Sequence, residues 1–143
     1  MKIMIACSTA FYDNIEEISK QLIKNGHEII YPNGYNEEIE EKSYEEMTHQ
    51  EYVDFFQNMF KLSNKKVKEA DALLVLNYSK IKNENIQENY IGASTFLEMY
   101  EAFMQKKKIF ILNSLPDSSN MLLDEIKGFN PIILNGNLDK IKE

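Results

Sequence analysis

Five short apolar runs alternate along the chain with longer segments of mixed polarity. The runs are rich in Ile, Leu and Val and are continuous, with no regular alternation of apolar and polar residues. Such runs are typical of strands buried on both faces of a parallel sheet. The predicted strands are Ile3–Cys7, Glu28–Tyr31, Ala72–Asn77, Ile109–Leu112 and Pro131–Leu134.

The segments between these runs predict helices, because their apolar residues recur three and four positions apart. The first helix is expected to stop at Asn25–Gly26, and the second, which is long, near Glu69. The four apolar stripes are Ile15, Ile18, Leu22 and Ile23; Tyr52, Phe55, Phe56, Met59 and Leu62; Phe96, Met99, Tyr100 and Phe103; and Met121, Leu122 and Ile126.

Strands that alternate with helices predict an α/β fold, here a single domain over residues 1–143. We expect a three-layer α/β/α sandwich with a five-stranded parallel sheet of the flavodoxin-like order 2-1-3-4-5. Ligands bind such sheets beyond the carboxyl ends of the strands, where the strand order reverses. Those ends are Cys7–Phe11, Asn77–Ser79 and Asn113–Leu115. The polar segments are Asn33–Glu46 and Lys80–Asn89, and the second is long enough to act as a lid.

The charge of the chain limits the classes of partner that it can bind. The net charge is −7, and all 16 basic residues are lysines. An acidic surface argues against binding to nucleic-acid backbones, which depends on neutralising phosphates. Without arginine there is no bidentate fork for phosphate, so a phosphorylated ligand must rely on lysines, hydroxyls and helix N-termini.

The single cysteine and the lengths of the apolar runs suggest a location. Cys7 has no internal disulfide partner, which suits a reducing compartment. The apolar run at the N-terminus is too short for a signal peptide, and no run approaches the roughly 18 residues of a membrane span. We therefore expect a cytoplasmic protein without membrane contact.

Common cofactor and metal signatures are missing. The first strand leads into Ser8-Thr9-Ala10, which fits neither the dinucleotide fingerprint nor a P-loop. His27 and His49 have no ligand partners at metal spacing. We expect no cofactor and no metal, and we interpret Cys7 as a small buried apolar residue rather than a nucleophile.

Glu98 is the strongest candidate for chemistry. It follows Gly92-Ala93-Ser94 near the start of the third predicted helix, and with Thr95 it matches the capping box T-x-x-E. A carboxylate in the first turn is also stabilised in its ionised form by the helix dipole, as a nucleophile requires. Spacing alone favours the cap, and both interpretations stay open on these residues.

Three segments resemble the nucleoside 2-deoxyribosyltransferase-like superfamily, which includes deoxynucleotide N-hydrolases. They are Asn77-Tyr78, Asn89–Met99 and Lys107–Asn113, and the resemblance extends from the first strand to Leu134. It implies the flavodoxin-like fold and an enzyme that cleaves or transfers the N-glycosidic bond of a (deoxy)nucleoside or nucleotide. Glu98 stands at the position of the glutamate that attacks the anomeric carbon, where a carboxylate stabilises the oxocarbenium-like transition state.

The second acid of the family is missing from its position. Counting along the second helix places that position at Ser63, which is followed by Asn64. If the register differs, Glu51 or Asp54 can substitute. The acid that the family carries before the glycine is also replaced, and Glu88 is the nearest carboxylate.

The substrate-binding residues that we expect lie in loops. Each has a structural alternative: Ser8 as a loop exit, Phe11 as a core residue, Asn77 as a strand end, and the tyrosines as lid or interface aromatics. The candidates are Ser8, Phe11, Asn77, Tyr78, Asn89, Tyr90 and Gly92.

The sequence is compatible with two functions. The first is an enzyme that acts on the N-glycosidic bond, and the second is a non-catalytic nucleoside- or nucleotide-binding module of the same fold. In an enzyme, Glu98 and a second carboxylate should face one cavity, whereas in a binding module Glu98 should only cap its helix. The scarcity of cations favours a nucleoside over a nucleotide. The resemblance also implies a homodimer or higher homo-oligomer, for which the apolar helix around Phe55, Phe56, Met59 and Phe60 is a suitable interface.

Overall fold

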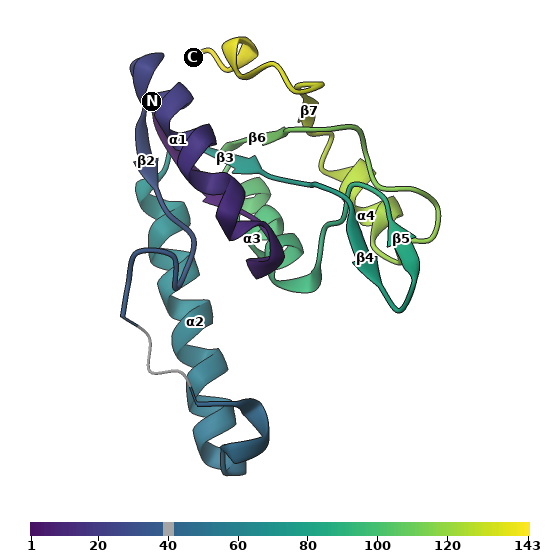
Figure 1. Ribbon diagram of the computed structural model, residues 1–143. Coiled ribbons are helices and arrows are strands. Elements are labelled where there is room, and N and C mark those ends of the chain that lie inside the picture. The colour runs from purple at the N-terminus through teal and green to yellow at the C-terminus, as the bar shows by residue number, and fades with distance from the viewer. Residues whose placement is uncertain (39–41) are drawn as a thin grey trace.

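The computed structural model describes residues 1–38 and 42–143 and contains a five-stranded parallel sheet (Figure 1). The sheet order is β2-β1-β3-β6-β7, which is 2-1-3-4-5 when its strands are numbered along the chain. The predicted strand order is therefore confirmed. The strands are β1 (Lys2–Ala6), β2 (Glu28–Ile30), β3 (Ala72–Val75), β6 (Lys108–Ile111) and β7 (Ile132–Ile133).

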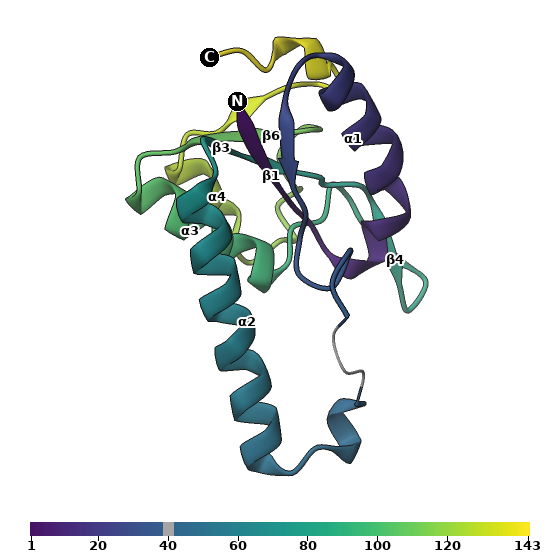
Figure 2. The ribbon, with the colours of Figure 1, turned by 90° about the vertical axis from the view of Figure 1, so that its left-hand side faces the viewer.

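Helices cover both faces of the sheet (Figure 2). The helix α1 and the C-terminal turn η3 pack on one face, and the helices α2, α3 and α4 on the other. The elements are η1 (Thr9–Asn14), α1 (Ile15–Lys24), η2 (Tyr44–Glu46), α2 (His49–Glu69), α3 (Ala93–Met104), α4 (Leu123–Gly128) and η3 (Leu138–Lys140). The predicted three-layer sandwich is thus confirmed.

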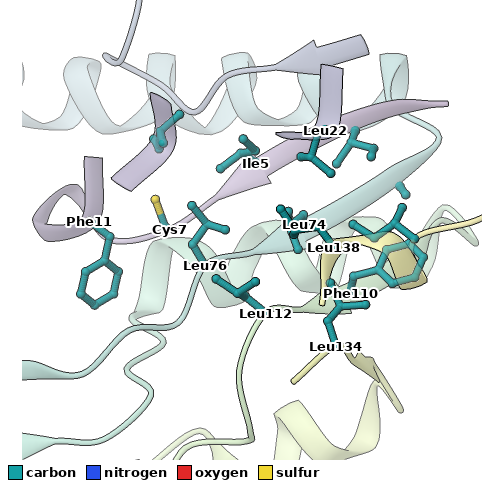
Figure 3. Close-up of a cluster of buried hydrophobic side chains, with 14 residues drawn as sticks. Ile5, Cys7, Phe11, Leu22, Leu74, Leu76, Phe110, Leu112, Leu134 and Leu138 are labelled. Atoms are coloured by element: carbon teal, nitrogen blue, oxygen red, sulfur yellow. The ribbon is translucent and has the colours of Figure 1, made fainter. Parts of the chain in front are cut away.

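Successive residues of the strands enter two separate cores. Ile5 and Leu74 belong to the core under α1, together with Leu22 (Figure 3). Met4 and Leu73 belong to the core under α2, α3 and α4. Because both faces of the sheet are covered, β3 is apolar at every position, and β1 and β6 are apolar at all positions after their first residue, which explains the continuous runs in the sequence.

The helix α3 begins earlier than its sequence predicts. Gly92 is the N-cap and no side chain caps this helix, so Thr95 is the third helical residue and Glu98 lies in the second turn. The predicted Thr95–Glu98 capping box is therefore wrong, because Gly92 is an acceptable N-cap and the helix begins at Ala93. The capping box of this chain is at the start of α2, where Thr48 and Glu51 satisfy each other's backbone N–H groups.

The predicted lid is a hairpin. Within Lys80–Asn89, β4 (Lys80–Lys82) pairs antiparallel with β5 (Asn85–Gln87). The residues between them, Asn83 and Glu84, both have positive φ, as a two-residue hairpin turn with the twist of the strands requires.

The N-terminal half of α2 extends away from the sheet in both views, with η2 beside its start (Figures 1 and 2). The polar segment Asn33–Glu46 leads to this end, and its residues 39–41 lie outside the described part of the chain. None of the helices in the described ranges combines the length and the apolar character that crossing a membrane requires.

Candidate functional site

A cleft of about 1280 Å³ opens beside the carboxyl end of β1. Its walls are the loop that follows β1, the loop that follows β2, and the facing sides of α2 and α3. The neighbours of β1 in the sheet are β2 and β3, so the cleft lies where the strand order reverses. The residues that follow β3 and β6, at Asn77–Ser79 and Asn113–Leu115, do not line it.

Glu98 lies in this cleft and is almost buried, with 8% of its surface exposed. Burial raises the pKa of the Glu98 carboxyl to about 7, and the nearby Glu101 adds to this rise. A hydrogen bond with Ser63 and the positive charge of Lys66 act in the opposite direction. A buried carboxyl group that titrates near neutral pH inside a cleft is typical of functional sites.

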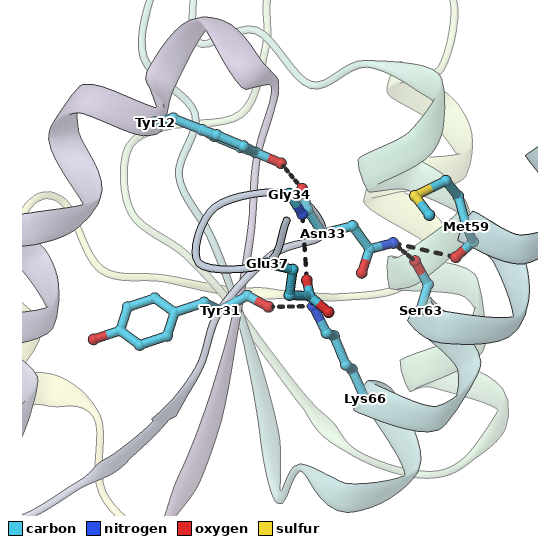
Figure 4. Close-up of polar contacts among 8 residues, drawn as sticks. All are labelled: Tyr12, Tyr31, Asn33, Gly34, Glu37, Met59, Ser63 and Lys66. Carbon is cyan, nitrogen blue, oxygen red and sulfur yellow. Dashed lines mark hydrogen bonds and ion pairs between the residues drawn. The ribbon is translucent and has the colours of Figure 1, made fainter. Parts of the chain in front are cut away.

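Ser63 connects Glu98 to the loop after β2. The amide of Asn33 donates hydrogen bonds to Ser63 Oγ at 2.9 Å and to the backbone oxygen of Met59 at 3.1 Å (Figure 4). The hydroxyl of Tyr12 donates to the backbone oxygen of Asn33 at 2.6 Å. The loop is thereby held against both α2 and η1, and the Ser63 hydroxyl is left to bond with Glu98.

Ser63 of α2 lines the cleft together with Glu98 and shares a hydrogen bond with it. The two alternative acids on this helix lie elsewhere: Glu51 bonds with Lys42 at 2.7 Å and Asp54 accepts a bond from Gln50 at 2.8 Å. Glu88 is exposed and does not line the cleft. None of these three carboxylates supplies the missing second acid.

A buried ion pair supports the wall of the cleft. Lys66 Nζ lies 2.7 Å from Glu37 Oε1 and donates to the backbone oxygen of Tyr31 at 2.9 Å (Figure 4). Glu37 also accepts a bond from the backbone N–H of Gly34 at 3.3 Å. The pair holds the loop after β2 to α2 and places a positive charge near Glu98.

A second carboxyl group lines the cleft one helical turn after Glu98. It belongs to Glu101, whose Oε1 accepts a bond of 3.5 Å from the Asn64 amide. Its Oε2 is buried and has no hydrogen-bond partner among the described residues, and the same is true of Asn33 Oδ1. The cleft therefore presents two free acceptor atoms close to Glu98.

Of the residues predicted to bind substrate, the structure places Ser8, Tyr90 and Gly92 in the cleft with Glu98. A Cβ atom at Gly92 would lie only 2.9 Å from the Tyr90 hydroxyl oxygen. Glycine therefore leaves room for the Tyr90 ring to lie against the start of α3, and a larger residue would have to displace it. Ser8 Oγ accepts a bond of 3.3 Å from the backbone of Ala10 and caps η1.

The other four predicted residues lie outside the cleft. Phe11 is 4% exposed and packs edge-on against Tyr78 at 5.4 Å between ring centroids, so it is a core residue. Both residues border a separate hollow with Ser79 and Lys80. Asn77 is fully buried, and Asn89 closes the hairpin with a positive φ and a backbone bond to Ser79 Oγ.

Asn77 has a structural role that its sequence position does not reveal. Its amide donates to the backbone oxygen of Ser114 at 2.8 Å and accepts from the backbone N–H of Asn113 at 2.8 Å. These bonds join the ends of β3 and β6, where a buried amide must satisfy its own polar atoms. The Asn77 side chain is consequently used in hydrogen bonds within the protein.

Several residues at the cleft were not predicted from the sequence: Tyr12, Asn33, Glu37 and Glu101 line it, and Lys66 supports its wall. Glu101 had a local signal, since residues three apart on a helix share a face and Glu98 was already a candidate. The other four come from distant segments and have no local pattern.

Cys7 also lines the cleft, and the residue is 9% exposed. Burial, followed by the charge of Glu98, raises the pKa of this thiol to about 12. The thiolate is therefore disfavoured, in agreement with an apolar rather than a nucleophilic role. In the described ranges no three His, Cys, Asp or Glu side chains gather in a way that could hold a metal ion.

No protein-family model matches the chain, and no curated protein matches it in sequence. Solved structures do match it. The 2-deoxyribosyltransferase of Bacillus psychrosaccharolyticus superposes with a TM-score of 0.50 and 20% identity over 78% of this chain and 71% of that chain.

Two further solved structures match over more of this chain. The CMP N-glycosidase BcmB of Clostridium botulinum has a TM-score of 0.55 and 17% identity over 94% of this chain and 90% of that chain. A conserved protein of Enterococcus faecalis V583 has a TM-score of 0.51 and 16% identity over 91% and 74%. The chain therefore shares the fold of these solved structures, in agreement with the predicted flavodoxin-like sandwich.

Proposed function

We propose that this chain cleaves or transfers the N-glycosidic bond of a (deoxy)nucleoside or nucleotide, with Glu98 as the nucleophile. The observation that carries the proposal is the position of Glu98, which lies nearly buried in the cleft and does not cap its helix. Other carboxyl groups, including Glu101, face the same cleft, as an enzyme of this kind requires. The names of two structural neighbours, a deoxyribosyltransferase and an N-glycosidase, indicate the same chemistry.

In the proposed reaction, the Glu98 carboxylate attacks the anomeric carbon while the bond to the base nitrogen breaks. The transition state resembles an oxocarbenium ion, and a nearby carboxylate stabilises its positive charge. The resulting glycosyl ester is resolved by water in hydrolysis or by a second base in transfer. Because Glu98 is largely removed from solvent, its interaction with the developing charge is stronger than it would be in water.

We assign substrate contacts to the three predicted residues that line the cleft. Ser8 and the backbone at Gly92 offer polar groups to the sugar, and Tyr90 offers a hydroxyl group and an aromatic ring. On the opposite wall, Phe55 and Phe56 of α2 face the cleft and offer rings on which a base can stack.

A non-catalytic binding module is the second candidate function. The observation that favours it is Ser63, whose hydroxyl stands where the family carries a second acid and cannot protonate a leaving base. In that case the cleft would bind a nucleoside without turnover, and Glu98 would act as a hydrogen-bond acceptor for the ligand.

The experiment that separates these functions measures base release from a panel of deoxynucleosides and deoxynucleoside monophosphates, with and without an acceptor base. The wild type should release or exchange a base, and Glu98→Gln and Glu98→Ala should lose this activity. Glu88→Gln is the matched control, because Glu88 is exposed and outside the cleft. No turnover of any substrate, with ligand binding retained in calorimetry, would instead support the binding module.

A further inference from the structure

Glu101 has an unsatisfied carboxylate oxygen inside the cleft. Its Oε2 is buried without a hydrogen-bond partner among the described residues, while its Oε1 has a single long bond of 3.5 Å to Asn64. Leaving a buried polar atom unpaired costs free energy, so such atoms are rare in folded proteins and call for an explanation. An oxygen in a ligand-sized cleft is explained if a substrate atom or proton satisfies it.

The proposed reaction needs an acid, because a departing base carries negative charge on its ring nitrogen unless it is protonated. Ser63 cannot meet this need. Its hydroxyl is a very weak acid, and it is already engaged with Glu98 and with the Asn33 amide.

The other carboxyl groups of the cleft are less suited to the task. The carboxylate of Glu37 is already engaged in an ion pair with the ammonium group of Lys66 at 2.7 Å. Glu46 lies in η2 and is exposed to solvent. Glu101 is the carboxyl group that combines a free buried oxygen with a position beside Glu98.

The spacing along α3 supports this role. Residues three apart on a helix have Cβ atoms about 5–6 Å apart and lie on one face. In retaining glycosidases the carboxyl groups of the nucleophile and the acid are about 5–5.5 Å apart, a separation that two glutamates on one face of a helix can reach. The charge of Glu101 contributes to the raised pKa of Glu98, so the two side chains lie close enough to interact.

On the basis of the proposed function, we propose that Glu101 is the catalytic acid and base of this chain, in place of the acid missing at Ser63. In the first step Glu98 forms an ester with the anomeric carbon, the bond to the base breaks, and the Glu101 proton moves to the base nitrogen. In the second step the Glu101 carboxylate takes a proton from water, and the hydroxide oxygen displaces Glu98 from the sugar. The products are the free base and the free sugar, and both carboxyl groups return to their initial states.

The test uses two substrates that differ in their need for an acid, 2′-deoxyguanosine and 7-methyl-2′-deoxyguanosine. The methylated base is cationic and leaves as a neutral molecule without protonation. Glu101→Gln should lower kcat/KM on deoxyguanosine by about 10²–10⁴-fold and on the methylated substrate by less than about 3-fold. Glu98→Gln should lose both activities, and Glu125→Gln, on the exposed surface of α4, should lose neither.

Equal losses on both substrates, or no loss on either, would overturn the role of Glu101 while leaving Glu98 as the nucleophile. A wild type that turns over neither these two substrates nor any other nucleoside would overturn the proposed function and this inference together. Thermal unfolding of Glu101→Gln should match the wild type within a few degrees. If that variant does not fold, Glu101→Ala is used, since it should show the same difference between the two substrates.

Discussion

Ser63 on α2 donates a hydrogen bond to the carboxylate of Glu98 on α3, across the cleft that the two helices enclose. The bond stabilises the ionised form of Glu98 and so opposes the effect of burial, which raises the pKa of this carboxyl to about 7. The Asn33 amide holds Ser63 in place at 2.9 Å. Ser63 therefore tunes the charge of the nucleophile that we propose.

The pH dependence of the reaction should report this contact. A nucleophilic Glu98 must be ionised, so kcat/KM of the wild type should rise with pH through a midpoint near 7. Ser63→Ala removes a hydrogen bond to the ionised form of Glu98 and therefore raises the pKa of this carboxyl. The midpoint of the rise in kcat/KM should then move to higher pH by about one unit. Ser63→Thr keeps the hydroxyl and should behave like the wild type. An unchanged midpoint of this pH dependence in Ser63→Ala would contradict the prediction.

Glu98 should also affect the stability of the fold in a pH-dependent way. Its folded pKa of about 7 lies above the value near 4.5 of an ordinary glutamate, so the folded state binds the proton more tightly. Its contribution is therefore most favourable below pH 4.5 and is lost as the pH rises towards 7. Glu98→Gln removes this dependence, and its gain in unfolding free energy over the wild type should grow across this range to about 3 kcal/mol. Chemical unfolding at several pH values measures the difference, and a constant difference would contradict it.

The partly buried ion pair between Lys66 and Glu37 should be required for the shape of the cleft. Lys66→Met leaves Glu37 and the Tyr31 carbonyl without their partner and should cost about 1–3 kcal/mol in unfolding free energy, since Glu37 is partly exposed. Adding Glu37→Gln should recover part of the loss, because the unpaired charge is then gone. If the losses of unfolding free energy in the two single variants simply add in the double variant, Lys66 and Glu37 do not stabilise the fold through their interaction.

The charges of the cleft predict a preference for uncharged substrates. The lining includes the carboxyl groups of Glu37, Glu46, Glu98 and Glu101, while Lys42 and Lys66 are each paired with a glutamate. Phosphate is repelled by this charge, so kcat/KM should be at least about tenfold higher for a nucleoside than for its 5′-monophosphate at low salt.

Raising the ionic strength should reduce this difference, because salt screens the repulsion. Faster turnover of the monophosphate would contradict the prediction. That result would show that the N–H groups at the start of α3, beside Gly92, hold the phosphate instead.

The homodimer expected from the sequence stays a prediction. Aromatic residues on the projecting part of α2 and near it are partly exposed, with 42% for Tyr52, 47% for Phe60 and 59% for Tyr44. A second copy that covers them would remove apolar surface from water. Light scattering should show a dimer that Phe60→Asp dissociates, whereas Ile81→Asp on the exposed hairpin should have no effect. A wild type that is monomeric in solution would contradict the predicted homodimer.

Much of the fold could be predicted from the sequence because its signals are local. A strand buried on both faces must be apolar at every position, so runs such as Ala72–Val75 were visible directly. The Asn25–Gly26 stop and the spacing of Ile15 and Leu22 likewise located α1. The start of α3 was less well determined, because both Gly92 and Thr95 are acceptable N-caps and only the packed helix distinguishes them.

The cleft depended on contacts between distant segments. The sequence by itself determined the alternation of strands and helices, the position of Glu98 near the start of a helix, and the register that places Ser63 on α2. Only the tertiary structure showed that Asn77 and Phe11 are buried in the protein interior, that Asn33 lines the cleft, and that Lys66 supports its wall. The physical reason is that apolar periodicity follows from burial along one element, whereas hydrogen bonds, desolvation and charge coupling depend on which elements pack together.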